Sequence, residues 1–425
     1  MATVAVGRHR PEGAVSATGS APDVVAPPPH HRRFPLFDGL RAIAVLSVVV
    51  FHVTLLTGTL STSVTGHLLA RLNIGVTIFF LISGFLLYRP FIAHRIGGAA
   101  PPEFLQYAKR RVLRIYPAYW LLLTALVIVP GVGGYPDSGL WAEYGLVQTL
   151  PLQGGAGCTG DCGLTQTWSL VAEVTFYAAL PLYVLLAARV ARGRSVLGWM
   201  RAELLLLAAL SAIALALRFL LVDAGSPWVD GTLIGYVFWF ALGMGLAVAS
   251  VGLEGRERQP RLLSVVASRP LIPWLAALAT YVLLSLWLPV LLATEAQQLV
   301  ALLALGVIAA LLLLPAVFGD DAGGFPRRVL ANPVVAWLGV VSYGIFLWHF
   351  VFAQQLGGGR YDGGFVVVLL GTLAFSTACA AASYYLVERP ILRFKYRRLP
   401  DLVRVARPRR AGSVPAPDVS QPGRL

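Results

Sequence analysis

Ten long apolar stretches alternate with short polar segments along the chain, and each is close to the ~20 residues that a helix needs to cross a bilayer core. They span 38–57, 74–93, 116–131, 168–188, 202–222, 232–252, 271–291, 297–317, 334–354 and 365–387. The third is shortened by Pro130-Gly131, and the seventh and eighth are separated by little more than Ala293-Thr294-Glu295. The pattern predicts an all-α, polytopic membrane protein with about ten transmembrane helices.

The two ends of the chain lack this pattern. Residues 1–34 are polar and Pro-rich, and residues 396–425 are basic and then rich in Pro, Ser and Gly, so we expect both tails to be mostly disordered. The first tail holds no apolar core of a cleavable signal peptide, and we expect the first span to act as the insertion signal. One membrane domain, 35–395, lies between the tails.

Charge supports this interpretation and orients the chain. Only 13% of the 425 residues are charged, against about 25% in soluble domains. If the N-terminus is cytoplasmic, nearly all of the 34 Lys and Arg residues fall on the cytoplasmic side, and the opposite segments hold only Arg71 and Arg360. We therefore predict a multi-pass plasma-membrane protein with both termini inside. The net charge of +14 is then explained by basic residues at the cytoplasmic face of the membrane, and no nucleic-acid partner is required.

Two ionisable residues share one face of the first span. Arg41 and His52 are eleven residues apart, which returns them to the same side of a helix about 16.5 Å apart along its axis. Ionisable groups inside a bilayer are costly and usually mark a pathway or a reaction site. The pair indicates chemistry carried out within the membrane, with His52 able to take and give a proton near neutral pH.

Counting from the span ends brings four ionisable groups to one layer in the outer half: His52, Glu173, Arg218 and His349. Each also has a purely structural interpretation. His52 can bond a helix backbone, Glu173 can neutralise Arg218, and His349 can be a packing residue. The register of His52 with Arg41 and the matching depth of Glu173 favour a functional role for these two.

Arg111 and Arg114 are three residues apart in a basic stretch before the third span, on one helical face. They are explained either as an ordinary signal of cytoplasmic location or as a site for a phosphate-rich ligand, since guanidinium groups bind phosphates bidentately.

Cys158 and Cys162 fall in a Gly-rich segment predicted to be exported, where a local disulfide or two free thiols are equally compatible with the sequence. No further Cys or His lies nearby, so we expect no metal site.

Taken together, the motifs resemble the acyltransferase-3 family of integral-membrane O-acyltransferases. The resemblance runs from about 35 to 395. It rests on Phe37-Asp38-Gly39-Leu40-Arg41 with His52, the stretch 75–87, Arg111-x-x-Arg114-Ile115-Tyr116-Pro117, the stretch Thr167–Tyr177 with Trp168, Ser169 and Glu173, the stretch Ser342–His349 with Tyr343, and Glu388-Arg389-Pro390. The cysteine pair is outside this pattern.

The resemblance implies transfer of an acyl group, commonly acetyl, from acetyl-CoA or another cytoplasmic acyl-CoA to a hydroxyl of a glycan, glycolipid or sugar-bearing metabolite. It implies that His52 is the base or acyl acceptor and that Glu173 orients it. Arg41, Arg111 and Arg114 would hold the donor's phosphates. Trp168, Ser169, Arg218, Tyr343 and His349 would support the site. The activated thioester requires no metal.

Two other classes are compatible with charged residues at depth. A secondary transporter or flippase for a lipid-linked or small polar substrate is the main alternative, although no internal repeat is apparent. A lipid-interacting scaffold is disfavoured by a buried His and Glu.

Overall fold

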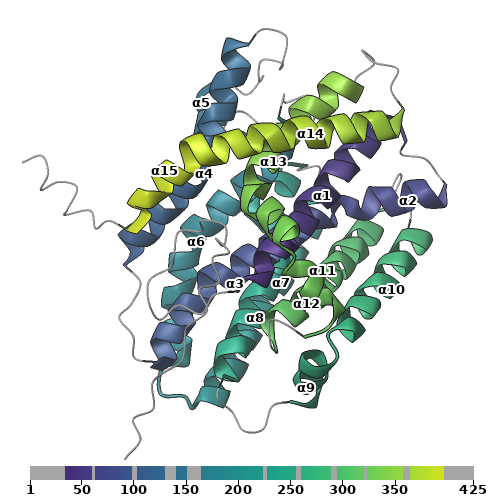
Figure 1. Ribbon diagram of the computed structural model, residues 1–425. Coiled ribbons are helices and arrows are strands. Elements are labelled where there is room, and N and C mark those ends of the chain that lie inside the picture. The colour runs from purple at the N-terminus through teal and green to yellow at the C-terminus, as the bar shows by residue number, and fades with distance from the viewer. Residues whose placement is uncertain are drawn as a thin grey trace, which may run out of the picture.

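The computed structural model describes residues 34–59, 63–97, 103–129, 140–150, 164–223, 227–254, 260–288, 294–319, 323–357 and 364–396, and every regular element in these ranges is helical (Figure 1). The α-helices are α1 (Leu36–Leu56), α2 (Val64–Ala70), α3 (Ile74–Gly97), α4 (Phe104–Ile128), α5 (Leu140–Gly145), α6 (Trp168–Ala191), α7 (Val196–Asp223), α8 (Leu233–Gly252), α9 (Arg261–Ser268), α10 (Leu271–Trp287), α11 (Glu295–Val317), α12 (Phe325–Leu330), α13 (Pro333–Gly357), α14 (Phe365–Ser383) and α15 (Arg389–Leu392). A π-helical segment, Tyr384–Glu388, joins α14 to α15.

The all-α, polytopic fold class is confirmed. Within the described residues, nine helices are long and apolar enough to cross a membrane, and the bent pair α9–α10 makes a tenth if it counts as one span. The orientation with both termini inside stays a prediction.

The border of the third span differs most from the sequence prediction. We expected that span at 116–131, after a basic loop, whereas α4 runs without a break from Phe104 to Ile128. The basic segment is amphipathic, with Tyr107 and Ile115 buried while its charged side chains lie elsewhere on the helix surface, so it extends the span as helix. As a result, Arg111 and Arg114 are held by a long helix.

The seventh span is shorter than predicted and is preceded by a sharp bend. α9 and α10 meet at 96°, and α10 has only 17 residues. Arg269 precedes Pro270 and has a non-helical backbone, as residues before proline prefer. The buried guanidinium of Arg327 donates to the carbonyl oxygens of Val266 and Ala267 at the end of α9, which stabilises the bend.

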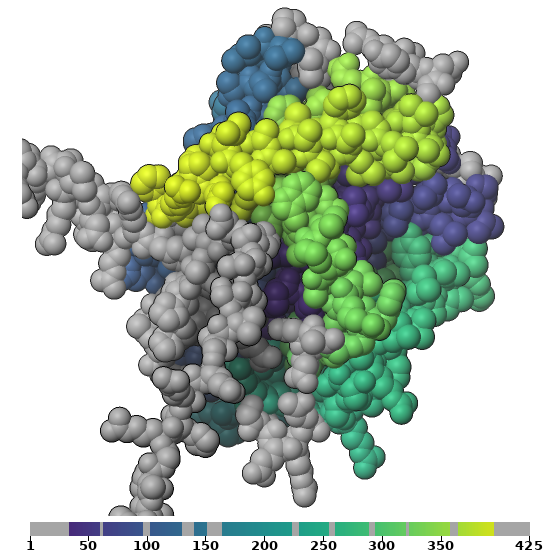
Figure 2. Space-filling model, viewed as in Figure 1, coloured from purple at the N-terminus to yellow at the C-terminus, as the bar shows by residue number. Residues whose placement is uncertain are grey.

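Helix α1 packs mainly on α13, and also on α3 and α14. In Figure 2 it is visible only as a narrow purple strip between the later helices. The contact between α1 and α13 is close because Gly339 lies directly against the carbonyl oxygen of Asp38, where a Cβ atom would overlap it. The two helices stay in contact further along, where α1 carries His52 and α13 carries His349.

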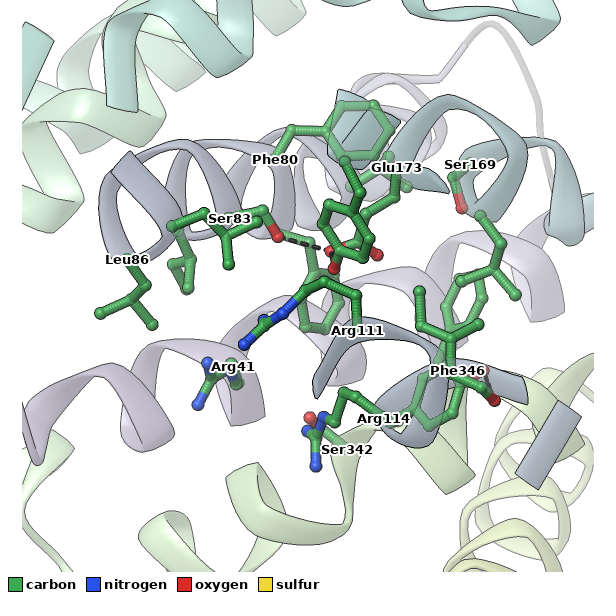
Figure 3. A pocket seen from close by; sticks show the side chains of 18 residues that line it. Arg41, Phe80, Ser83, Leu86, Arg111, Arg114, Ser169, Glu173, Ser342 and Phe346 are labelled. Atoms are coloured by element: carbon green, nitrogen blue, oxygen red, sulfur yellow. Dashed lines mark hydrogen bonds between the residues drawn. The ribbon is translucent and has the colours of Figure 1, made fainter. Parts of the chain in front are cut away.

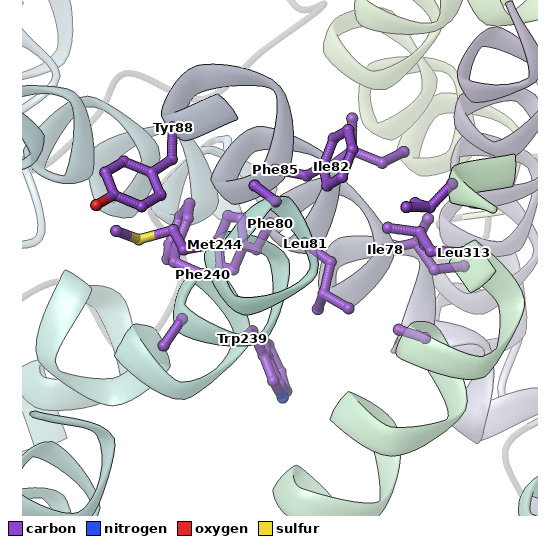
Figure 4. Close-up of a cluster of buried hydrophobic side chains, with 14 of the residues drawn as sticks. Ile78, Phe80, Leu81, Ile82, Phe85, Tyr88, Trp239, Phe240, Met244 and Leu313 are labelled. Carbon is purple, nitrogen blue, oxygen red and sulfur yellow. The ribbon is translucent and has the colours of Figure 1, made fainter. Parts of the chain in front are cut away.

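A second close contact joins α3 to α8. Gly243 lies against the backbone of Leu81, and between the helices the ring of Phe80 stacks on Phe240, with centroids 4.5 Å apart. Phe240, which lies beside Phe80 in Figure 4, also stacks on Phe176 of α6, with centroids 4.1 Å apart. Three aromatic rings from three helices thus form one layer, which fixes α6 relative to α3.

Candidate active site

His52 of α1 and His349 of α13 form a direct pair. Nε2 of His349 lies 3.1 Å from Nδ1 of His52, and the rings are 5.0 Å apart. His349 is fully buried, and His52 is 9% exposed. The sequence placed both residues at the same depth, and the structure shows that they are in contact.

The backbone around the pair determines which nitrogen carries the proton. Nδ1 of His349 lies 2.7 Å from the carbonyl oxygen of Phe346, and Nδ1 of His52 lies 3.0 Å from that of Val48. A carbonyl oxygen only accepts, so both Nδ1 atoms are assigned as protonated in the neutral rings. Nε2 of His349 is then an acceptor for the Nδ1–H of His52.

This assignment leaves Nε2 of His52 with a lone pair, and that atom makes no hydrogen bond to any residue the structure describes. If Nε2 took up a proton, the positive ring would still donate from Nδ1 to Val48 and His349. Phe51 and Phe350 lie edge-on to the His52 ring, with centroids 5.0 and 5.2 Å away, and restrict its orientation. The ring is therefore held with one basic nitrogen available.

Glu173 of α6 belongs to a different cluster. Its Oε1 atom accepts a 2.6 Å hydrogen bond from the Ser83 hydroxyl of α3 (Figure 3). It accepts another from the Tyr177 hydroxyl one turn along α6. In the described part of the chain, Glu173 and His52 make no hydrogen bond with each other. Glu173 was expected to orient His52, but no hydrogen bond joins the two residues. His349 contacts Nδ1 of His52 instead.

Glu173 lines a cavity of about 120 Å³ that also contains three arginines, Arg41 of α1 and Arg111 and Arg114 of α4 (Figure 3). Arg41 forms a 2.6 Å ion pair with Asp38. Arg111 lies over the rings of Tyr107 and Tyr177, and Arg114 over the ring of Tyr343, at 5.8 to 6.0 Å. Among the described residues, neither Arg111 nor Arg114 forms a salt bridge with a carboxylate. The cavity therefore has cationic groups suited to an anion.

Two of the supporting residues named from the sequence, Ser169 and Tyr343, line this cavity, and Trp168 does not. Ser169 lines it and donates to the carbonyl oxygen of Gln166. Tyr343 lines it and donates a 2.8 Å hydrogen bond to the carbonyl oxygen of Ile115, which ties α13 to α4. Trp168 packs on Tyr236, with ring centroids 4.8 Å apart, at the start of α6.

Two sequence-based candidates lie apart from the cavity or outside the described residues. Arg218 of α7 forms a 2.7 Å ion pair with Asp230 and does not line the cavity, so the alternative in which Glu173 neutralises it does not describe this structure. Cys158 and Cys162 lie outside the described residues, and the disulfide remains a prediction.

Sequence reasoning missed four contributors. Ser83 and Tyr177 hold Glu173, and Tyr177 was detectable because it is four residues after Glu173 and so on the same helix face. Phe79 and Phe346 line the cavity, with ring centroids 6.5 Å apart, and Phe346 also lies 5.8 Å from the His349 ring. The two phenylalanines connect the arginine-lined cavity to the histidine pair, which hydropathy could not reveal.

A buried histidine pair and an arginine-lined cavity thus lie between the membrane helices. A model of the acyltransferase domain family matches residues 35–385, and the chain belongs to this family. The enzyme class predicted from the sequence is thereby confirmed, and the transporter alternative is not supported.

Three relatives illustrate the family. Nodulation protein 10 of Rhizobium leguminosarum is 27% identical over 76% of this chain and 82% of its own length. The putative peptidoglycan O-acetyltransferase YrhL of Bacillus subtilis is 26% identical over 85% of this chain, which covers 55% of that protein. The exopolysaccharide production protein ExoZ of Rhizobium meliloti is 29% identical over 77% of this chain and 92% of its own length. No solved structure matches.

Proposed function

We propose that this protein transfers an acyl group, acetyl in the simplest case, from acyl-CoA to a hydroxyl group of a cell-envelope glycan. The observation that carries the proposal is the His52–His349 pair, which leaves Nε2 of His52 as a basic atom. The pair adjoins Phe346, which lines the arginine-lined cavity. The names of two relatives, which refer to peptidoglycan and to exopolysaccharide, support a glycan acceptor.

In the reaction, the acceptor oxygen attacks the thioester carbonyl while Nε2 of His52 takes the hydroxyl proton. His349 accepts the hydrogen bond from Nδ1 of His52 and so stabilises the positive ring, as the third member of a nucleophile–base–orienter set does. The C–S bond then breaks, and the leaving thiolate takes the proton from Nε2. If His52 instead carries the acyl group between donor and acceptor, the bond forms at the same atom, so Nε2 is the reacting atom on either route.

The arginines provide the donor end of the site. Arg111 and Arg114 offer guanidinium groups that form no salt bridge among the described residues, and Arg41 also lines the cavity. Arg41 and His52 are separated by about 16.5 Å along α1. The arm of acyl-CoA, which joins its phosphates to its thioester, has to bridge this distance. That arm passes Phe79 and Phe346, so these two rings border the path of the acyl group.

Glu173 belongs to the donor end in this proposal. Its carboxylate holds Tyr177, and the Tyr177 ring supports Arg111. The carboxylate therefore acts on the position of a phosphate-binding arginine, and the histidine pair functions as a separate unit.

The test uses purified protein in nanodiscs, acetyl-CoA with a labelled acetyl group, and membranes of a strain that lacks this gene as the source of acceptor. The proposal predicts alkali-labile label in the glycan fraction with wild-type protein and none with His52→Ala. Label that appears only in lipid or only as free acetate would contradict the glycan acceptor. Retention of glycan labelling by His52→Ala would contradict the assigned base.

A further inference from the structure

A second cavity, of about 290 Å³, lies between α6, α7 and α8 and is almost entirely apolar. The aromatic layer separates it from the arginine-lined cavity. Phe176 and Phe240 line the apolar cavity, and Phe80, which stacks on Phe240, lines the arginine-lined cavity. Nothing in the acyl-transfer chemistry uses this space.

The length of the cavity matches one leaflet of a bilayer. On α7 its lining runs from Leu207 to Leu217, and on α8 from Leu233 to Met244. Ten residues of helix rise about 15 Å, which is half of the ~30 Å hydrocarbon core. The cavity also opens sideways, since Ile213 and Leu217 on its rim are 57% and 43% exposed. A chain from one leaflet can therefore enter it from the bilayer.

One end of the cavity is polar. Tyr183 lines that end, and its ring packs on Tyr88 with centroids 5.2 Å apart. Glu203 precedes Leu207 by one turn, is fully buried, and forms a 3.0 Å ion pair with Arg95. The hydroxyls of Tyr183 and Tyr88 and one oxygen of Glu203 are buried without a hydrogen-bond partner among the described residues. The two tyrosine hydroxyls can donate hydrogen bonds to the ester oxygens of a lipid, which only accept.

Positive charge continues beyond this polar end. Arg189 lies six residues past Tyr183 on α6, and Arg201 lies six residues before Leu207 on α7, each about 9 Å further along its helix. Both are exposed, and the turn between the helices adds exposed Arg192 and Arg194. Basic clusters at the ends of transmembrane helices attract anionic headgroups.

We propose that the apolar cavity and the arginines beyond its polar end bind one anionic phospholipid. An acyl chain lies in the cavity and the glycerol at Tyr183 and the Arg95–Glu203 pair. The phosphate lies among the arginines of the α6–α7 turn. The order of apolar, polar and basic groups along α6 and α7 repeats the order of chain, glycerol and phosphate in such a lipid. The site is independent of the acyl-transfer reaction.

The first experiment fills the apolar cavity with a larger side chain. Ala214 is buried in its wall, whereas Ala216 lies two residues away on α7, is exposed and does not line it. Wild-type protein, Ala214→Phe and Ala216→Phe are purified from membranes and analysed by native mass spectrometry as detergent is raised. We expect wild type and Ala216→Phe to retain one bound phospholipid. The fraction of Ala214→Phe that carries a phospholipid should be at least fivefold lower. Equal retention in all three proteins would overturn the proposal.

The second experiment tests the headgroup. Lipid-stripped protein is offered phosphatidylglycerol or phosphatidylcholine with the same acyl chains. We expect wild type to prefer phosphatidylglycerol at least fivefold and R189Q/R201Q to lose that preference. The matched control, R261Q/R269Q, removes two exposed arginines at the two ends of α9 and keeps the preference. Equal uptake of both lipids by wild type, or an unchanged preference in R189Q/R201Q, would overturn the anionic assignment.

Discussion

His349 Nε2 accepts a hydrogen bond from Nδ1 of His52 across 3.1 Å, although the two residues are 297 positions apart in the chain. The contact is possible because α1 and α13 pack on each other more extensively than any other pair of helices in the described residues. It gives His52 an orienting partner of the kind that carboxylates provide in other acyl-transfer enzymes.

Replacing His349 by Ala should lower kcat by roughly 100-fold, at the low end of what positioned acid–base catalysis contributes, because Val48 still holds Nδ1 of His52. The KM for acyl-CoA should change little, since His349 does not line the arginine-lined cavity. His349→Gln, whose amide oxygen can accept from Nδ1, should recover part of the lost activity. A rise in KM with unchanged kcat would show that His349 acts on donor binding instead.

Replacing Arg111 and Arg114 together by Gln should raise the KM for acyl-CoA by roughly 100-fold or more. Hydrogen bonds to a charged group contribute about 1.5–3 kcal/mol each. Arg110→Gln, at the next position along α4 and not lining the cavity, is the control. Unchanged donor affinity in R111Q/R114Q would leave the two arginines as signals of membrane topology.

Glu173→Gln separates the two roles considered for this residue. If Glu173 positions Tyr177 and Arg111, its loss should raise the donor KM, and its effect on kcat/KM should multiply with that of His349→Ala. If instead it orients His52, as the sequence first indicated, the double variant should be no worse than His349→Ala alone, because residues that act as a unit are non-additive. Steady-state kinetics of the two single variants and the double variant distinguish these outcomes.

Arg327 is 2% exposed and donates to five backbone carbonyls, among them Pro315 and Phe318 at the end of α11. Arg327→Met should therefore destabilise the protein by about 3 kcal/mol or more, since each buried carbonyl left unpaired costs about 1–3 kcal/mol. Arg328→Met, at an exposed position, should have little effect. Thermal unfolding followed by size-exclusion chromatography measures both, and equal melting of the two variants would contradict the anchoring role.

Much of the fold could be predicted because hydrocarbon imposes long apolar helices, and their positions follow from hydropathy alone. The borders were less predictable where amphipathic or bent segments joined a span. The basic start of α4 is a helix that hydropathy reads as a loop, and the α9–α10 bend depends on Arg327, 60 residues further along the chain.

The site was predictable in depth but not in its angular arrangement. Counting from span ends placed His52, Glu173, Arg218 and His349 in one layer, yet only His52 and His349 are in contact with each other. Depth along a helix follows from residue number, whereas the neighbour of each helix depends on packing between segments distant in sequence, such as α1 with α13. The partners of Glu173 and Arg218 were therefore beyond what one sequence reveals.

The central claim is that Nε2 of His52 is the reacting atom and that His349 orients the His52 ring. The most direct measurement is acyl transfer from labelled acetyl-CoA by His52→Ala, His349→Ala and the double variant, each shown by chromatography to be folded. The account predicts no transfer above background for His52→Ala, reduced transfer for His349→Ala, and a double variant no worse than His52→Ala. Near-normal turnover by His52→Ala would contradict it.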